Sequence, residues 1–166
     1  MIDRARERLQ TYAPRPRHAP TAKPAAVLLL LYHDQGTERV LLTRRTEEVG
    51  VHPDDVEILG RLDDMVTISD YLVAPYVGVL RRTPYEFIPQ DSEVAQIIEP
   101  PVAHLMDDAN RVSEARASDA GTVYAPAYIW EGHRIWGATA RMLCEFLELL
   151  RGDAERLESA RVRKVP

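Results

Sequence analysis

The chain has 166 residues, of which 45% are hydrophobic and 28% charged, and this size and composition predict one compact globular domain. Its formal net charge of -5 argues against a protein that mainly binds nucleic acid, because binding phosphates requires a concentrated basic surface. The first residues are charged, and the longest apolar run, residues 25–32, is too short to span a membrane. We therefore expect a soluble cytoplasmic protein with neither nucleic acid nor a membrane as its partner.

The N-terminal segment is predicted to stand apart from the main domain. Residues 2–11 have a helical composition, and the prolines that follow end this helix and predict an extended arm. The last residues are charged and are expected to lie on the surface. The expected division is an N-terminal helix and proline-rich arm over residues 1–24, a main domain over 25–150, and a charged tail over 151–166.

The first half of the main domain carries strand patterns. The apolar runs at residues 25–32 and 39–43 flank a turn, which predicts a hairpin. Further strands are expected over residues 56–62 and 71–80, and the second of these contains a proline that suits an edge or a bulge.

The second half of the main domain ends in a helix. A helical turn is expected over residues 102–106, a loop over 107–121, and a hairpin around the Glu131-Gly132 turn. Residues 137–150 have the apolar spacing of an amphipathic helix, and the single cysteine of the chain, Cys144, is expected to lie in its buried face. Strands first and one terminal helix, without regular βαβ alternation, predict an α+β fold with a mixed or antiparallel sheet.

Four strings in the same order along the chain carry a family resemblance. They are residues 41–46 (LLTRRT), residues 59–64 with 73–78 (LGRLDD, VAPYVG), residues 91–94 (DSEV) and residues 135–141 (IWGATAR). Together they resemble the Nudix hydrolases of the coenzyme A diphosphatase branch. The resemblance implies a Nudix-like α/β/α sandwich around a mixed sheet, and a small-molecule nucleotide substrate of the coenzyme A class.

The resemblance also implies a metal cofactor. Nudix hydrolases cleave a nucleoside diphosphate linked to another group, and their signature, G-x5-E-x7-R-E-U-x-E-E-x-G-U with U bulky and aliphatic, forms a loop, a helix and a loop. Carboxylates three and four residues apart share a helix face and converge on one Mg²⁺ or Mn²⁺ ion. This ion neutralises the diphosphate and acidifies the attacking water.

Only the end of this signature has a counterpart here. Residues 47–51 (EEVGV) match E-E-x-G-U, whereas the first glycine, the first glutamate and the R-E pair are missing. Relatives carry similar strings at the end of the strand and at the end of the box, so our hypothesis is an in-frame deletion that fused the two. We expect a fold missing the Nudix-box loop and helix. The partly bare sheet face would favour a homo-oligomer or low solubility.

The resemblance assigns roles to six residues. They are Glu93 as a catalytic group, Arg44, Arg45 and Thr67 as substrate-binding groups, and Glu47 and Glu48 as metal ligands. A guanidinium pairs bidentately with phosphate, which suits the two arginines. Simpler interpretations stay open: a solvated charge pair for the arginines and for the adjacent glutamates, which do not share a helix face, and an exposed strand-end carboxylate for Glu93.

Other polar and aromatic residues have two interpretations each. Asp63 and Asp64 would border the nucleotide pocket of the family, although turn chemistry explains an Asp-Asp pair equally well. The aromatic residues of the second hairpin would stack a base or pack across the strands: Tyr124, Tyr128 and Trp130. Trp136 is expected to pack in the core.

Two functions remain open from the sequence. The first is a metal-dependent diphosphatase acting on coenzyme A or a related nucleotide. The second is a catalytically inactive Nudix remnant that binds a nucleotide or a protein.

Overall fold

A mixed β-sheet is the largest sheet in the computed structural model, which describes residues 1–43, 49–85, 88–89, 97–118, 121–153 and 155–158. The strand order is β4-β6-β1-β2-β8, with β5 paired to β6. These strands are β1 (Lys23–Asp34), β2 (Thr37–Thr43), β4 (Val56–Arg61), β5 (Met65–Val66), β6 (Tyr71–Leu80) and β8 (Ile97–Ile98). Strand β1 runs parallel to β6 over nine residue pairs, from Lys23↔Tyr71 to Leu31↔Val79, and antiparallel to β2.

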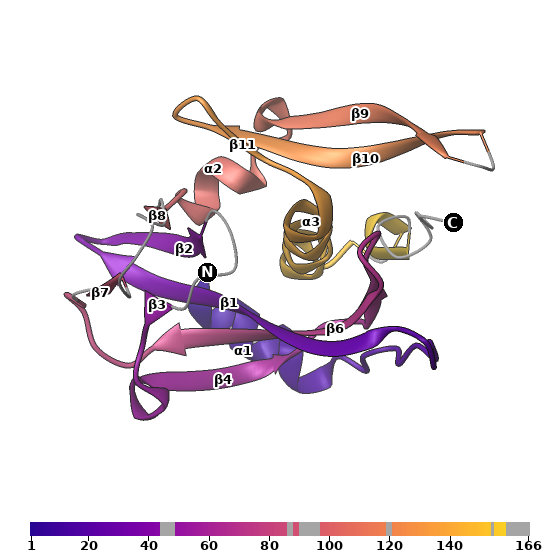
Figure 1. Ribbon diagram of the computed structural model, residues 1–166. Helices are drawn as coiled ribbons and strands as arrows, with labels where there is room; N and C mark the ends of the chain where they lie inside the picture. The colour runs from indigo at the N-terminus through magenta and orange to yellow at the C-terminus, as the bar shows by residue number, and fades with distance from the viewer. Residues whose placement is uncertain (44–48, 86–87, 90–96, 119–120, 154, 159–166) are drawn as a thin grey trace.

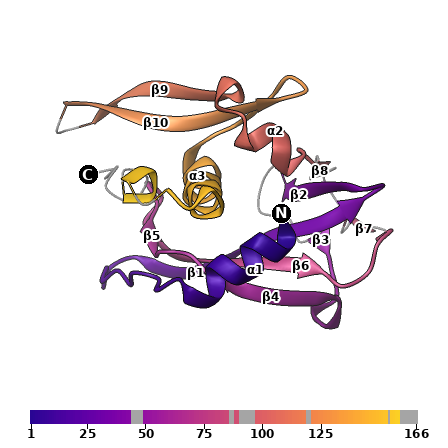
Figure 2. The same ribbon diagram turned by 180° about the vertical axis from the view of Figure 1, so that it is seen from behind.

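Two smaller sheets accompany the main sheet. Strand β3 (Val49–Gly50) pairs with β7 (Ile88–Pro89). A three-stranded sheet has the order β11-β10-β9 and contains β9 (Arg111–Ser118), β10 (Gly121–Trp130) and β11 (His133–Ile135). Figures 1 and 2 show helix α3 (Gly137–Arg151) between the three-stranded sheet and the main sheet, so the two sheets enclose this helix.

Helix α1 (Ile2–Thr11) packs beside α3 and contributes to the same core. It buries Ile2, Ala5 and Leu9 against the inner face of the main sheet. Its approach to β4 is close because Gly60 has no side chain: a Cβ atom there would lie 2.8 Å from the Cβ of Leu9. Three short helices complete the fold: α2 (Val102–Met106), η1 (Pro53–Asp55) and η2 (Asp108–Asn110).

The α+β class with a mixed sheet is confirmed. The predicted hairpin appears as β1 and β2, the later strands as β4 and β6, and the terminal helix as α3, in which Cys144 is buried. Strand β1 begins at Lys23, so Pro24 belongs to the strand instead of the arm. The three-part division at residues 24 and 150 stays a prediction. In the described part of the chain, no helix has the length and apolar character needed to cross a membrane.

The predicted loop over residues 107–121 is wrong. This stretch contains η2 and the eight-residue strand β9, which pairs with β10 from Arg111↔Tyr128 to Ser118↔Gly121. The sequence of β9, RVSEARAS, is polar because the strand lies at the edge of its sheet, where charged side chains are common. Backbone pairing with β10 forms this strand, and apolar alternation does not mark it.

The expected burial of Trp136 is also wrong. Its side chain is 49% exposed, and the guanidinium carbon of Arg134 lies 5.2 Å from the centre of its ring. Trp136 occupies the N-cap position of α3 with an extended backbone, and Gly137 follows with a φ of +68°. The turn into the helix therefore leaves the indole at the surface, where a cation over the ring is favourable.

A buried polar cluster attaches the segment after α1 to the core. The hydroxyl of Tyr12 lies 2.8 Å from Oδ1 of Asp63 and 2.7 Å from Oε1 of Glu145. The backbone N–H of Arg15 donates to the same Asp63 oxygen, and the N–H of Asp63 donates to Glu145. Both carboxylates are buried, so they depend on these donors in place of water.

We predict that Tyr12→Phe destabilises the protein by about 1–3 kcal/mol, because the buried carboxylates of Asp63 and Glu145 lose a donor. Chemical denaturation measures this change in the free energy of unfolding. The matched control is Tyr124→Phe, since Tyr124 is 59% exposed and this change should stay within about 0.5 kcal/mol of wild type. Equal stability of the two variants would contradict the role given to the cluster.

Candidate functional site

Two short β-ladders bring together the ends of both predicted site segments. Residues 44–48 join β2 to β3, and residues 90–96 join β7 to β8. The flanking residues pair as Thr43↔Ile97 and Val49↔Pro89. Each end of one segment is therefore a backbone neighbour of an end of the other.

The residues that these segments carry lie outside the described residues. They are Arg44, Arg45, Glu47 and Glu48 in the first segment and Glu93 in the second. Their roles stay predictions, and the structure contributes the positions of the strands on either side of them.

Thr67 is described and belongs to the turn between β5 and β6. Its hydroxyl accepts a hydrogen bond from the N–H of Tyr71 at 3.1 Å, and its own N–H donates to the Tyr71 carbonyl at 2.9 Å. This turn lies beside Lys23 at the start of β1, whereas β2 pairs with β1 from Leu30 onward. This register puts Thr43 of the β2–β8 ladder level with Leu28, which is about 16 Å along the strand from Lys23, so the structure does not bring Thr67 to the ladders. Its substrate-binding role stays a prediction.

The carboxylates of Asp63 and Asp64 bind the N-terminal arm. Asp64 accepts the backbone N–H of Arg17 at 3.1 Å and pairs with the guanidinium of Arg61, while Asp63 binds Tyr12 and Arg15 as described above. Both side chains are buried. These contacts favour the structural interpretation of the Asp-Asp pair over a role beside a nucleotide.

The described residues do not form a metal site by themselves. Across the ranges that the structure describes, no group of three or more His, Cys, Asp and Glu side chains is arranged to hold an ion. A hard divalent cation needs several oxygen ligands. The ligands predicted from the resemblance, Glu47 and Glu48, lie in the segment outside these ranges.

Glu99 is a carboxylate near the ladders that the sequence reasoning did not single out. It follows β8 directly, and its side chain accepts a hydrogen bond from the hydroxyl of Tyr32 on β1. Nη1 of Arg39 donates to the Glu99 carbonyl at 2.8 Å. Burial raises the pKa of Tyr32, and the hydrogen bond to Glu99 raises this pKa further, so the phenol stays a donor. In the sequence, the feature that could have indicated a partly buried carboxylate is the position of Glu99 between two isoleucines and two prolines.

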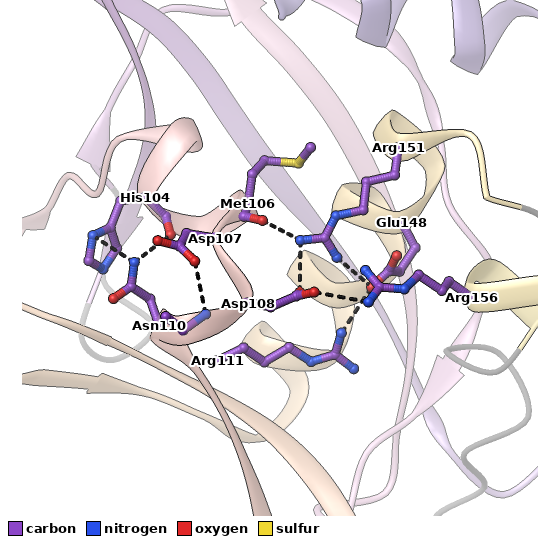
Figure 3. A network of polar contacts seen from close by, with 10 residues as sticks. His104, Met106, Asp107, Asp108, Asn110, Arg111, Glu148, Arg151 and Arg156 are labelled. Carbon is purple, nitrogen blue, oxygen red and sulfur yellow. Dashed lines mark hydrogen bonds and ion pairs between the residues drawn. The ribbon is translucent and has the colours of Figure 1, made fainter.

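A second polar network, shown in Figure 3, joins α3 to the three-stranded sheet. At its centre is Glu148, which is 2% exposed. Its Oε1 accepts hydrogen bonds from Arg111 of β9 and from Arg151, both at 2.9 Å. Its Oε2 is buried and has no hydrogen-bond partner among the residues that the structure describes. Arg151 also pairs with Asp108 of η2 at 2.9 Å, so one carboxylate and one guanidinium link three elements.

His104 of α2 contacts both η2 and β10, and Figure 3 shows its contact with Asn110 of η2. Nε2 of His104 lies 2.7 Å from the carbonyl oxygen of Ile129. The side-chain amide of Asn110 donates to the His104 carbonyl at 3.0 Å. The imidazole also meets the edge of Trp130, with ring centres 4.6 Å apart. Trp130 therefore packs against a helix, which agrees with a structural use of this aromatic residue.

We predict that Glu148→Ala lowers the free energy of unfolding by about 3–5 kcal/mol, because it leaves two largely buried guanidinium groups without their shared carboxylate. Glu148→Gln, which keeps the acceptor oxygen but removes the charge, should lose less. Chemical denaturation compares both with Asp3→Asn, whose exposed ion pair with Arg6 contributes about 0–1 kcal/mol. A loss for Glu148→Ala no greater than for Asp3→Asn would refute the role of this network.

The same network predicts an acid-sensitive contact. The hydrogen bond from Arg156 holds the pKa of Asp108 below its ordinary value of 3.8; the charge of Arg151 acts in the same direction and burial opposes both. A depressed carboxyl pKa stabilises the fold above the unfolded-state pKa of about 4, and this contribution is lost as the pH falls through the lower folded-state value.

We therefore expect the melting temperature of Asp108→Asn to fall less steeply than that of wild type below about pH 4. Thermal denaturation of both proteins over a pH series measures the two slopes. Parallel curves would show that Asp108 contributes nothing to the acid dependence.

Comparison with known proteins adds the family context. No family model matches the chain. Three curated relatives are similar to it: Nudix hydrolase 15, mitochondrial, from Arabidopsis thaliana, and two proteins named Uncharacterized Nudix hydrolase NudL, from Pectobacterium atrosepticum and Photorhabdus laumondii.

The plant protein is 27% identical over 161 residues, and the alignment covers 73% of this chain and 56% of the relative. The Pectobacterium protein is 28% identical over 112 residues, covering 66% and 57%. The Photorhabdus protein is 30% identical over 118 residues, covering 66% and 58%. The chain thus spans somewhat more than half the length of these relatives. The similarities support a place for it within the Nudix hydrolase superfamily.

Proposed function

We propose that this chain is a Nudix-type hydrolase of a nucleoside diphosphate-linked small molecule, with coenzyme A as the leading substrate. The observation that carries the proposal is the pairing of β2 with β8 and of β3 with β7. These ladders hold the flanks of residues 44–48 and 90–96 against each other, and the two segments carry five of the six candidate site residues.

Each of these five residues has a chemical role in the proposal. Arg44 and Arg45 bind the diphosphate, because a guanidinium matches two phosphate oxygens at once. Glu93 takes a proton from the attacking water. Glu47 and Glu48 bind the metal ion. Mg²⁺ or Mn²⁺, when bound, neutralises the charge of the diphosphate and acidifies water.

Coenzyme A is preferred among possible diphosphates because of the string at residues 41–46, LLTRRT, which resembles the signature of the coenzyme A diphosphatase branch. Similarity to relatives named Nudix hydrolase supports the reaction class, and their names state no substrate. A cytoplasmic location belongs to the same proposal, although the plant relative is named as mitochondrial.

A second candidate is a catalytically inactive Nudix remnant that binds a nucleotide or a protein. Two observations favour it. Only five residues separate Thr43 at the end of β2 from Val49 at the start of β3, far fewer than the Nudix signature needs. The alignment with the plant protein runs over 161 residues yet takes in 73% of this chain, which is about 121 residues, so it leaves a stretch of the relative unmatched. Both observations support the in-frame deletion.

Sequencing the coding DNA across residues 46–50 tests the deletion. If the deletion is real, the coding DNA has an uninterrupted reading frame in which the codon for Thr46 directly precedes that for Glu47. Additional codons in this place would restore residues of the box and would end the case for a remnant.

The activity test is hydrolysis of coenzyme A by the purified chain with Mg²⁺ or Mn²⁺, followed by chromatographic separation of the products. We expect metal-dependent turnover that falls by about 10²- to 10⁴-fold in Glu93→Gln, because this variant lacks the general base. The matched control is Glu7→Gln on the exposed side of α1, which should leave the rate unchanged.

The two candidates give different results. If no metal-dependent turnover is found and calorimetry detects binding of coenzyme A, the chain is an inactive remnant and the hydrolase proposal is refuted. Turnover that Glu93→Gln leaves intact would instead refute the role given to this carboxylate.

A further inference from the structure

Arg141 of α3 is a partly buried arginine without a carboxylate partner. Within the described ranges, its guanidinium forms neither a hydrogen bond nor an ion pair. The other partly buried arginines of the described chain each bind a carboxylate: Arg6, Arg39, Arg61, Arg111 and Arg151. Because an arginine is seldom withdrawn from water without a partner, the free donors of Arg141 require an explanation.

The proline-rich arm passes beside the side of α3 that carries Arg141. One helical turn after Arg141, the side chain of Glu145 accepts the backbone N–H of Asp63 at 2.8 Å. The next residue, Asp64, accepts the backbone N–H of Arg17 at 3.1 Å. Since residues four apart lie on the same side of a helix, these contacts bring Arg17 close to Arg141.

The two arginines are near enough for their charges to repel each other. Burial lowers the pKa of Arg141, the positive charge of Arg17 lowers it further, and the charge of Glu145 opposes both effects. The side chain of Arg17 is exposed and forms no hydrogen bond or ion pair with any residue that the structure describes. We call Arg17 and Arg141 the arginine pair.

The arm makes the surroundings of the arginine pair basic. Residues 12–24 contain two arginines, one histidine and one lysine, and no acidic residue, although the whole chain has a net charge of -5. Basic side chains are therefore concentrated at this place. An anion that approaches the arm meets no carboxylate of the arm itself.

A simpler interpretation of Arg141 is a counter-charge for the buried Glu145. However, Oε1 of Glu145 already lies 2.7 Å from the hydroxyl of Tyr12 and 2.8 Å from the backbone nitrogen of Asp63. No hydrogen bond joins Arg141 to Glu145, and Arg17 has the larger effect on the pKa of Arg141. A counter-charge role alone therefore leaves the donors of Arg141 unused.

We propose that the arginine pair is a binding site for a phosphate group. A guanidinium offers two parallel N–H donors that match two phosphate oxygens, and a doubly charged phosphate balances two guanidiniums better than a carboxylate does. The phosphate is either inorganic phosphate or a phosphomonoester on a nucleotide. Neither arginine belongs to residues 44–48 or 90–96, so the site is additional to the proposed hydrolase site.

Isothermal titration calorimetry with inorganic phosphate at low ionic strength tests the site. We expect saturable binding to wild type, and an affinity about ten- to hundredfold lower in Arg141→Gln and in Arg17→Gln, because each variant loses charged hydrogen bonds. The matched control is Arg82→Gln, which removes the same charge from a side chain that is 82% exposed and bound to Asp55. This variant should bind phosphate like wild type.

Two further titrations identify the source of the phosphate. Adenosine 3′-monophosphate binding more tightly than inorganic phosphate, with adenosine alone not binding, supports a nucleotide phosphate. Equal affinities of the nucleotide and inorganic phosphate support a site for the free ion.

The proposal would be overturned if wild type did not bind phosphate, or if both arginine-pair variants bound it as tightly as wild type. Phosphate that binds only at residues 44–48 gives the second result. Thermal melting shows whether each variant is folded, and Arg17→Gln keeps the test decisive because the Arg17 side chain is exposed. No hydrolysis is measured, so the site and the proposed function fail separately.

Discussion

The parallel ladder between β1 and β6 is the constraint on which the other elements depend. Its nine residue pairs join two strands that are far apart in sequence, and the residues of β1 from Leu29 to Leu31 are buried. Both strands are interior in the sheet, with β2 on one side and β4 on the other. The close approach of β4 across β6 requires Gly78, where a Cβ atom would come within 2.9 Å of Val56. The positions of the β1–β2 hairpin and of helices α1 and α3, which share one core cluster, follow from this ladder.

The positions of the two short ladders around the candidate site depend on the same pairing of β1 with β6. Because β1 holds β2, it also sets the place of β8, and the contacts of Glu99 with Tyr32 and Arg39 fix the chain where β8 ends. The β3–β7 ladder then closes the other ends of the two site segments. Because backbone pairing of the flanking strands does not depend on the length of the segment between them, the proposed deletion is physically compatible with an intact surrounding sheet.

The sequence predicted the elements whose burial is visible in their own pattern. Continuous apolar runs gave β1 and β6, and helical spacing gave α3, including the buried Cys144. The strand β9 was missed because its stability comes from pairing with β10 at a polar edge, which leaves no apolar alternation. The network around Glu148 was missed for another reason. It joins residues up to 48 positions apart, and no local pattern reports such a contact.

The candidate site was predicted by resemblance of short strings, and the structure adds the ladders that pair the residues flanking segments 44–48 and 90–96. The proposed function requires a divalent ion to bind next to these ladders. Broadening of backbone amide signals by Mn²⁺ in a nuclear magnetic resonance titration tests it most directly. If the ion binds there, the amide signals of Thr43, Val49 and Ile97 broaden first, while that of Val112 in the three-stranded sheet stays sharp. Metal binding at this place would be contradicted if signals of the three-stranded sheet broadened first, or if no signal broadened at saturating Mn²⁺.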